Sequence, residues 1–155
     1  MKKIFILIGI LFSLCGCSSN EKNLIHEHCS RVGTISLDGR AELNYELYYT
    51  GDVLIKLESY ESVYSDDSIV LDTYQDAYQK IHDNYKDIKY YSTELKRDDK
   101  SVKSIMIIEY DKIDIDKLIE IEGVEDNIFD NKIPKASKWK EFAKKVGTSC
   151  SKVDN

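Results

Sequence analysis

ELNYELYYTGDVLIKLE (residues 42–58) holds two alternating segments joined by a turn. In the first segment, apolar or aromatic residues alternate with mostly polar ones, which is the pattern of an antiparallel strand with one buried face. One face carries Leu43, Tyr45, Leu47 and Tyr49, and the other carries Glu42, Asn44, Glu46 and Tyr48. Thr50-Gly51-Asp52 then predicts a hairpin turn into a second strand.

The strand after this turn alternates in the same way. One face carries Val53, Ile55 and Leu57, and the other carries Leu54, Lys56, Glu58 and Tyr60. Upstream, Val32, Ile35 and Leu37 predict a strand that begins near Arg31 and ends at the turn dipeptide Asp38-Gly39. The three strands together predict an antiparallel meander.

Helical spacing follows the meander. Asp72 and Gln75 resemble a capping box at a helix start, and an apolar stripe continues to Tyr85. Alternation then resumes in a second hairpin, from Ile88 to Leu95 and from Val102 to Tyr110. Its segment 105–108 is apolar on both faces, which predicts a central strand.

Two shorter helices are predicted near the C-terminus. Asp114 is the expected cap of one that ends at Gly123, and Pro134 is the expected first residue of another that ends before Gly147. The predicted order is βββ-α-ββ-α-α. It gives an α+β fold in which an antiparallel sheet of about five strands is covered on one face by helices.

Residues 1–16 have the features of a lipoprotein signal peptide. Lys2 and Lys3 precede an apolar run from Ile4 to Leu14, which is shorter than the ~20 residues of a membrane span. The end of the leader, Leu14-Cys15-Gly16-Cys17, resembles a lipobox, so we expect cleavage before Cys17 and a lipid on its sulfur. A secreted protein with a chance cysteine near its cleavage site is the alternative.

The rest of the chain suits one domain on a short anchor. We expect residues 17–28 to form a lipid anchor and polar tether, and residues 29–155 to form a single α+β domain. Without the leader, 20 basic residues (22 minus Lys2 and Lys3) stand against 28 acidic ones, a net charge of −8. This charge argues against nucleic acid as a partner, although simple solubility also explains it.

Cys29 and Cys150 are the cysteines that remain beyond Cys15 and Cys17. An even pair in an oxidising compartment predicts a disulfide between them. Two free thiols are the alternative.

Candidates for catalysis or metal binding are few. His26, His28 and Cys29 have spacing that a transition metal could use, but we expect a solvated tether there, without a fourth ligand. We expect His82 to face solvent on its helix. The sequence contains no nucleophile motif and no phosphate-binding glycine loop, so it indicates neither a cofactor nor a metal. It favours a binding protein over an enzyme.

Two acidic groups resemble calcium ligands only loosely. They are Asp111, Asp114 and Asp116, and Glu125, Asp126 and Asp130. The first group lacks the loop glycine and the closing glutamate of an EF-hand, so we interpret it as a strand end followed by a helix cap. The second group is interpreted as a solvated acidic loop.

The 11 tyrosines are the most suggestive feature for binding. An aromatic surface on the helix-free face of the sheet would suit a protein or a small molecule. The candidates are Tyr45, Tyr48, Tyr49, Tyr60, Tyr90 and Tyr91. The alternative is that tyrosine replaces phenylalanine at the edge of the core, with its hydroxyl group in water.

The chain carries a lipobox at Gly16-Cys17, a cysteine (Cys29) that opens the first strand, a meander, a tyrosine-rich helix, a second hairpin and terminal helices. In this layout it resembles the YehR-like small bacterial lipoproteins. The similarity covers residues 29–150. It implies an α+β lipoprotein domain without an assigned activity, and no catalytic residue follows from it.

The sequence therefore predicts a protein anchored by lipid to the extracytoplasmic face of a bacterial cell membrane, with a non-enzymatic binding or accessory role. Two alternatives stay open at this point: an envelope enzyme with an unrecognised site, and an acidic inhibitor of a cationic envelope or host enzyme.

Overall fold

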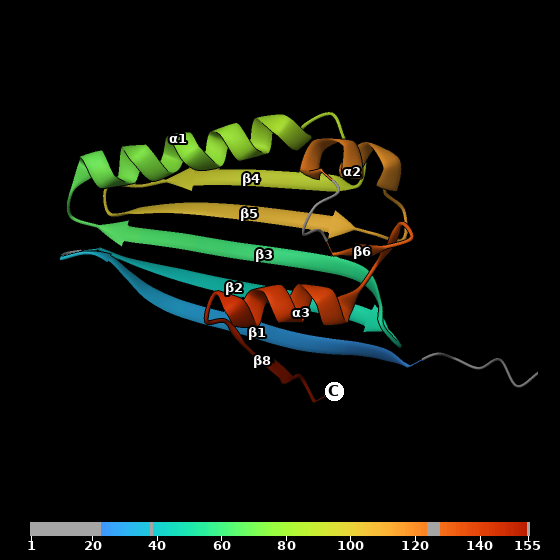
Figure 1. The fold of residues 1–155 in the computed structure, drawn as a ribbon. Coiled ribbons are helices and arrows are strands. Elements are labelled where there is room, and N and C mark those ends of the chain that lie inside the picture. The colour runs from blue at the N-terminus through green and yellow to red at the C-terminus, as the bar shows by residue number, and fades with distance from the viewer. Residues whose placement is uncertain (1–22, 38, 124–127, 155) are drawn as a thin grey trace, which may run out of the picture.

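The computed structural model describes residues 23–37, 39–123 and 128–154. Its main element is a six-stranded antiparallel sheet with the order β4-β5-β3-β2-β1-β8 (Figure 1). The strands are β1 (Leu24–Ser36), β2 (Gly39–Thr50), β3 (Val53–Ser65), β4 (Tyr91–Arg97), β5 (Ser101–Glu109) and β8 (Ser149–Lys152). The predicted α+β fold and the order βββ-α-ββ-α-α are confirmed, and β8 adds a sixth strand to the five expected.

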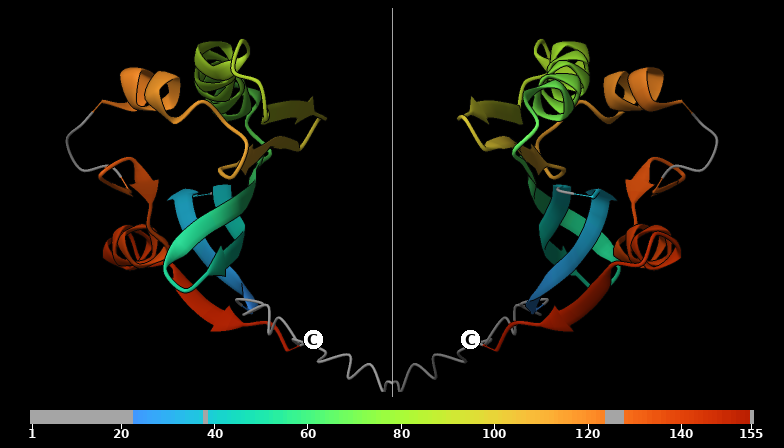
Figure 2. Two further views of the ribbon diagram at one scale, coloured as in Figure 1. Left: turned by 90° about the vertical axis from the view of Figure 1, so that its right-hand side faces the viewer. Right: turned by 90° about the vertical axis from the view of Figure 1, so that its left-hand side faces the viewer.

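The helices lie on one side of the sheet, as Figure 2 shows. They are α1 (Ser68–Tyr85), α2 (Ile115–Glu122) and α3 (Ala136–Lys145). Leu71 and Tyr78 of α1 pack against Val63 and Val102 of the sheet. The larger part of the core includes Leu118 of α2 and Trp139 of α3. Because Val63 lies on the same face of β3 as Leu57, both parts of the core share the helix-covered face.

The β2–β3 hairpin forms around Gly51, whose φ of 61° favours glycine at this turn. The register shifts between Tyr48 and Tyr49, so that Ile55 is left without a direct partner on β2. The predicted facing of Val53, Ile55 and Leu57 is therefore wrong at one end of the strand. Leu54 is buried beside Leu57, whereas Val53 is exposed, because the bulge reverses the alternation.

Two of the predicted helix starts are also wrong. Asp67 caps α1 with its Oδ1 atom 2.8 Å from the amide nitrogen of Ile69, so the helix begins before the predicted cap Asp72. Pro134 lies in β7 (Ile133–Pro134), which pairs with β6 (Phe129–Asp130), and α3 begins only at Ala136. The prediction for α2 is confirmed, because Asp114 caps its start and Gly123 ends it with a φ of 82°.

The first strand begins at Leu24 and not near Arg31. Residues 24–28 are thus part of the sheet, and the predicted tether is wrong for this stretch. The predicted disulfide is present: Cys29 on β1 is bonded to Cys150, its direct partner on β8. Residues 1–22, including Cys17 and the predicted leader, lie outside the described residues. None of the described helices is long and apolar enough to cross a membrane.

Candidate functional site

A cavity of about 360 Å³ lies between the helix-covered face of the sheet and the helices α2 and α3. Its floor is formed by strands β2 to β5, and α3 forms one wall. Its apolar lining includes Tyr45, Leu57, Tyr91, Met106, Ile108 and Trp139. A concave apolar site with a few polar groups is the usual form of a small-molecule site in proteins.

The aromatic rings around this cavity are held by their neighbours. Tyr45 of β2 meets Trp139 of α3 edge to face, with 5.1 Å between the ring centroids. Tyr91 of β4 stacks on Tyr85 of α1, with ring centroids 4.4 Å apart. Since each contact joins a strand to a helix, the rings form a fixed wall rather than free surface side chains.

Glu61 of β3 is the acidic group at the floor of the cavity. Its Oε1 atom accepts hydrogen bonds from the hydroxyl groups of Tyr45 at 3.1 Å and Ser59 at 3.4 Å. Burial and then the charge of Glu61 raise the pKa of Tyr45, and the same two causes raise the pKa of Tyr78 on α1. The Glu61 carboxylate is therefore surrounded by neutral hydroxyl donors.

Glu122, the last residue of α2, also lines the cavity. Burial raises the pKa of its carboxyl group, and the interaction with the Tyr85 hydroxyl lowers it. Burial, followed by the influence of Tyr85 and of Glu122, raises the pKa of Tyr91. The two carboxyl groups thus reach the same aromatic region from a strand and from a helix.

Neither glutamate was predicted from the sequence as a site residue. A signal was present in β3, because Leu57, Ser59, Glu61 and Val63 alternate onto one face and place a carboxylate among buried positions. A charge at such a position commonly has a functional or structural reason. For Glu122 we find no signal, because its approach to the cavity depends on how α2 packs.

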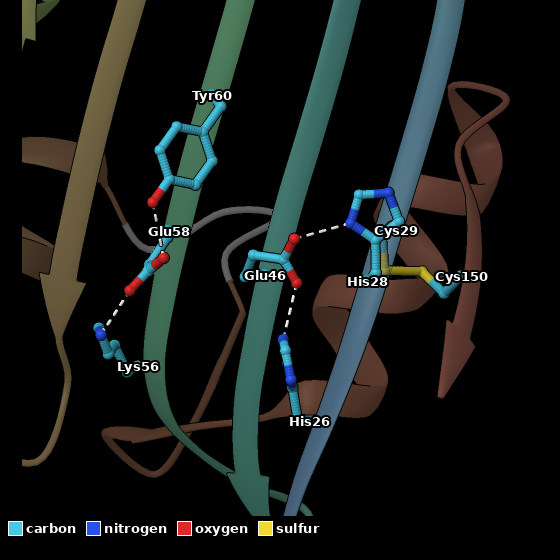
Figure 3. A network of polar contacts seen from close by, with 8 residues as sticks. All are labelled: His26, His28, Cys29, Glu46, Lys56, Glu58, Tyr60 and Cys150. Carbon is cyan, nitrogen blue, oxygen red and sulfur yellow. Dashed lines mark hydrogen bonds and ion pairs between the residues drawn. A yellow bond between two sulfur atoms is a disulfide. The ribbon is translucent and has the colours of Figure 1, made fainter. Parts of the chain in front are cut away.

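The predicted tyrosine surface is wrong as a single patch, because the structure divides its six members. Tyr45, Tyr49 and Tyr91 are buried or half-buried on the helix-covered face. Tyr48 lies on the helix-free face beside Lys56. Tyr60 lies on the same face, where its hydroxyl donates to Glu58 (Figure 3). Tyr90 lies in the connection before β4 with a φ of 68°. The aromatic groups that do gather are those around the cavity.

His26 and His28 were predicted on a solvated tether, but both belong to β1. Their ring nitrogens Nε2 and Nδ1 bond the two oxygens of Glu46 at 2.7 and 2.8 Å, as Figure 3 shows. His26 also stacks on Tyr48 with 4.4 Å between centroids. This network joins β1 to β2 on the helix-free face. Within the described ranges, no three His, Cys, Asp or Glu side chains are arranged to hold a metal ion.

His82 was predicted to face solvent, and this is wrong. It is buried, and its Nε2 atom lies 2.8 Å from the Oγ atom of Ser104, which is itself fully buried. Burial lowers the pKa of His82. The pair joins α1 to β5, so this histidine has a structural role in the core.

The candidate calcium ligands have other roles where the structure describes them. Asp114 caps α2, Asp116 pairs with Lys132, and Asp130 lies in β6. Asp111 is exposed in the turn after β5. Glu125 and Asp126 lie outside the described residues.

The comparisons with known proteins concern the fold. The sequence matches no protein-family model and no curated protein. The structure is similar to the NMR structure of the Escherichia coli YehR protein, with a TM-score of 0.59 and 22% sequence identity over 87% of this chain and 96% of that chain. The fold is therefore YehR-like.

A second similar structure is the NMR structure of a protein from Streptococcus pneumoniae TIGR4. It has a TM-score of 0.53 and 10% identity, and the match covers 97% of this chain and 94% of that chain. Both matches extend over nearly all of the neighbour's chain. At these identities the similarity concerns the fold alone.

Proposed function

We propose that this chain is a lipid-anchored protein of the bacterial cell envelope with a non-enzymatic binding role, and that its ligand occupies the cavity between the sheet and α3. The cavity carries the proposal, since about 360 Å³ lies within the usual size of small-molecule sites, roughly 300–1,000 Å³. Its walls combine aromatic side chains with two carboxyl groups, which is the mixture of apolar surface and few polar groups that such sites use.

The anchor is proposed from the leader residues 1–16 and from Cys17. The described chain is consistent with it, because β1 begins at Leu24, only a few residues after Cys17. A lipid on Cys17 would hold the domain close to the membrane surface.

The cavity is tested with N-phenyl-1-naphthylamine, a neutral probe whose fluorescence rises in apolar surroundings. We expect saturable binding of one probe per domain. Val146→Trp should weaken binding at least tenfold, because Val146 lines the cavity while the residue is 42% exposed, so a larger group can enter without disturbing the core. Ile69→Trp is the matched control, since Ile69 is 73% exposed on α1 and does not line the cavity.

Unsaturable binding, or equal affinity in wild type and Val146→Trp, would refute the cavity as the binding site. The anchor has its own test in cells that express the full chain. Cys17→Ala should abolish labelling with an alkyne-tagged palmitate and release the protein from the membrane fraction. Continued labelling of Cys17→Ala would place the lipid elsewhere.

A further inference from the structure

Glu61 differs from the other acidic side chains that are buried or half-buried on the described strands of the sheet. Each of the others has a basic partner within ion-pair distance. The pairs are Glu27 with Lys140, Glu42 with Arg40, Glu46 with His26 and His28, Glu58 with Lys56, and Glu109 with Lys112. Across residues 23–37, 39–123 and 128–154, Glu61 forms no ion pair and only hydroxyl groups donate to it.

The cavity itself offers no cation to Glu61. None of its described lining residues is lysine, arginine or histidine, whereas two of them, Glu61 and Glu122, are acidic. Arg31 of β1 is near enough to lower the pKa of Tyr45, but its guanidinium group donates to the carbonyl oxygen of Val146 at the end of α3. The described lining of the cavity is therefore acidic, and the Glu61 carboxylate at its floor has no ion-pair partner among the described residues.

This arrangement favours a cation inside the cavity. A half-buried carboxylate among apolar side chains has lost part of its hydration, and neutral hydroxyl donors replace only some of it. A charge-assisted hydrogen bond from an ammonium group is about twice as strong as a neutral one. Tyr45, Tyr91 and Trp139 line the same cavity, and aromatic rings attract cations at their faces.

We infer that the cavity binds a small organic cation, in which an ammonium group on an aromatic or aliphatic body meets Glu61 while the body packs against Trp139 and Met106. This inference rests on the proposed function, since it names the class of ligand for the same cavity. A carboxylate or phosphate ligand is excluded by charge, because it would lie against Glu61 and Glu122 without a basic side chain to bind it.

Three indole compounds of nearly equal size test the inference by isothermal titration calorimetry on the domain from residue 18 onward. Tryptamine is a cation at pH 7, tryptophol is neutral and indole-3-acetate is an anion. We expect tryptamine to bind at least tenfold more tightly than tryptophol, and indole-3-acetate to bind most weakly. In the variant Glu61→Gln, whose amide oxygen still accepts from Tyr45, the preference of tryptamine over tryptophol should fall to less than threefold.

Glu94→Gln is the matched control, because Glu94 is an exposed glutamate on β4 outside the cavity. It should keep the preference of the wild type. If tryptamine and tryptophol bind with equal affinity and Val146→Trp weakens both, the preference for a cation is refuted, whereas the cavity remains the binding site. Absence of binding by all three compounds at millimolar concentration, together with failure of the neutral probe, would overturn both proposals.

Discussion

Loss of the disulfide is expected to destabilise the domain strongly. Cys29 and Cys150 are separated by 121 residues, so the bond closes nearly the whole described domain into one loop. The chain-entropy relation, ΔS ≈ −2.1 − 1.5R ln n cal/mol/K, then gives about 4.9 kcal/mol at 25 °C for the restriction of the unfolded chain. Because native bridges usually contribute about 2–5 kcal/mol, we expect the double variant Cys29→Ala/Cys150→Ala to lose about 3–5 kcal/mol.

The assay is urea unfolding of both proteins, followed by the fluorescence of Trp139, which is buried in the native domain. Alanine is preferred to serine because Cys29 is fully buried and a hydroxyl group there would lack a partner. The m value should rise in the variant, since an unfolded chain without the cross-link exposes more surface. A loss of less than about 1 kcal/mol with an unchanged m value would refute the entropic reasoning.

The same variant has a local consequence at β8. All four residues of this strand are exposed, and among the described strands β8 pairs with β1 alone, so little buried apolar surface holds it on the sheet. Without the disulfide, amide protons of β8 should exchange at rates close to those of a free chain, while those of β2 and β3 stay protected. Protection of β8 that survives the double substitution would show that strand pairing alone suffices.

Three further changes test other parts of the structure. Because burial lowers the pKa of His82, the unfolded chain binds a proton at a higher pH than the native one, so stability should fall as the pH decreases below about 6.5. In urea titrations from pH 7 to pH 5, His82→Gln should show a smaller decrease than wild type, and an identical slope would contradict this role. Asp52→Ala should cost about 1 kcal/mol at pH 7, because the carboxylate accepts hydrogen bonds from the amide and the hydroxyl of Ser137 at the start of α3. These bonds lower the pKa of Asp52, so their contribution is present at neutral pH and is lost as the pH falls through the lowered pKa, below the ordinary value of 3.8. The exposed Asp76 gives the matched control, Asp76→Ala, and equal stability of the two variants would count against the cap. Leu118→Ala should cost about 2–5 kcal/mol by thermal or urea unfolding, since Leu118 is fully buried beneath α2, and a change below 1 kcal/mol would mean that α2 packs loosely.

Most of the fold could be predicted because its strands alternate and its turns carry glycine and aspartate. The β2–β3 hairpin and the central strand β5 follow directly from their patterns, and β5 indeed lies between β4 and β3. The bulge at Ile55 could not be predicted, because Val53, Leu54 and Ile55 are all apolar and their alternation fits either face. Only the pairing with β2 shows where the extra residue lies. The start of β1 was missed because His26, Glu27 and His28 are polar, yet Glu27 is buried and accepts a hydrogen bond from the Tyr49 hydroxyl at 2.7 Å.

The candidate site was less predictable than the fold. Tyr45 and Tyr49 alternate with the same phase as the fully buried Leu47, so their position on the covered face was contained in the pattern. The helix side chains that cover this face could not be predicted, because Trp139 and Glu122 reach it through the packing of two helices. Side chains that meet from four strands and two helices share no spacing in the sequence, and only the structure brings them together.

Helix α3 connects the fold to the cavity. At its start, the turn at Gly51-Asp52 provides the carbonyl oxygen of Asp52 for the amide of Ala136 at 3.0 Å, as well as the side-chain bonds to Ser137, 85 residues away. At its end, Arg31 of β1 donates to the carbonyl oxygen of Val146, and the chain continues into β8 and the disulfide. Between these two attachments, Trp139 and Ala143 face the cavity. The hairpin turn and the disulfide therefore act together, because they hold the two ends of the helix whose middle forms the wall of the proposed site.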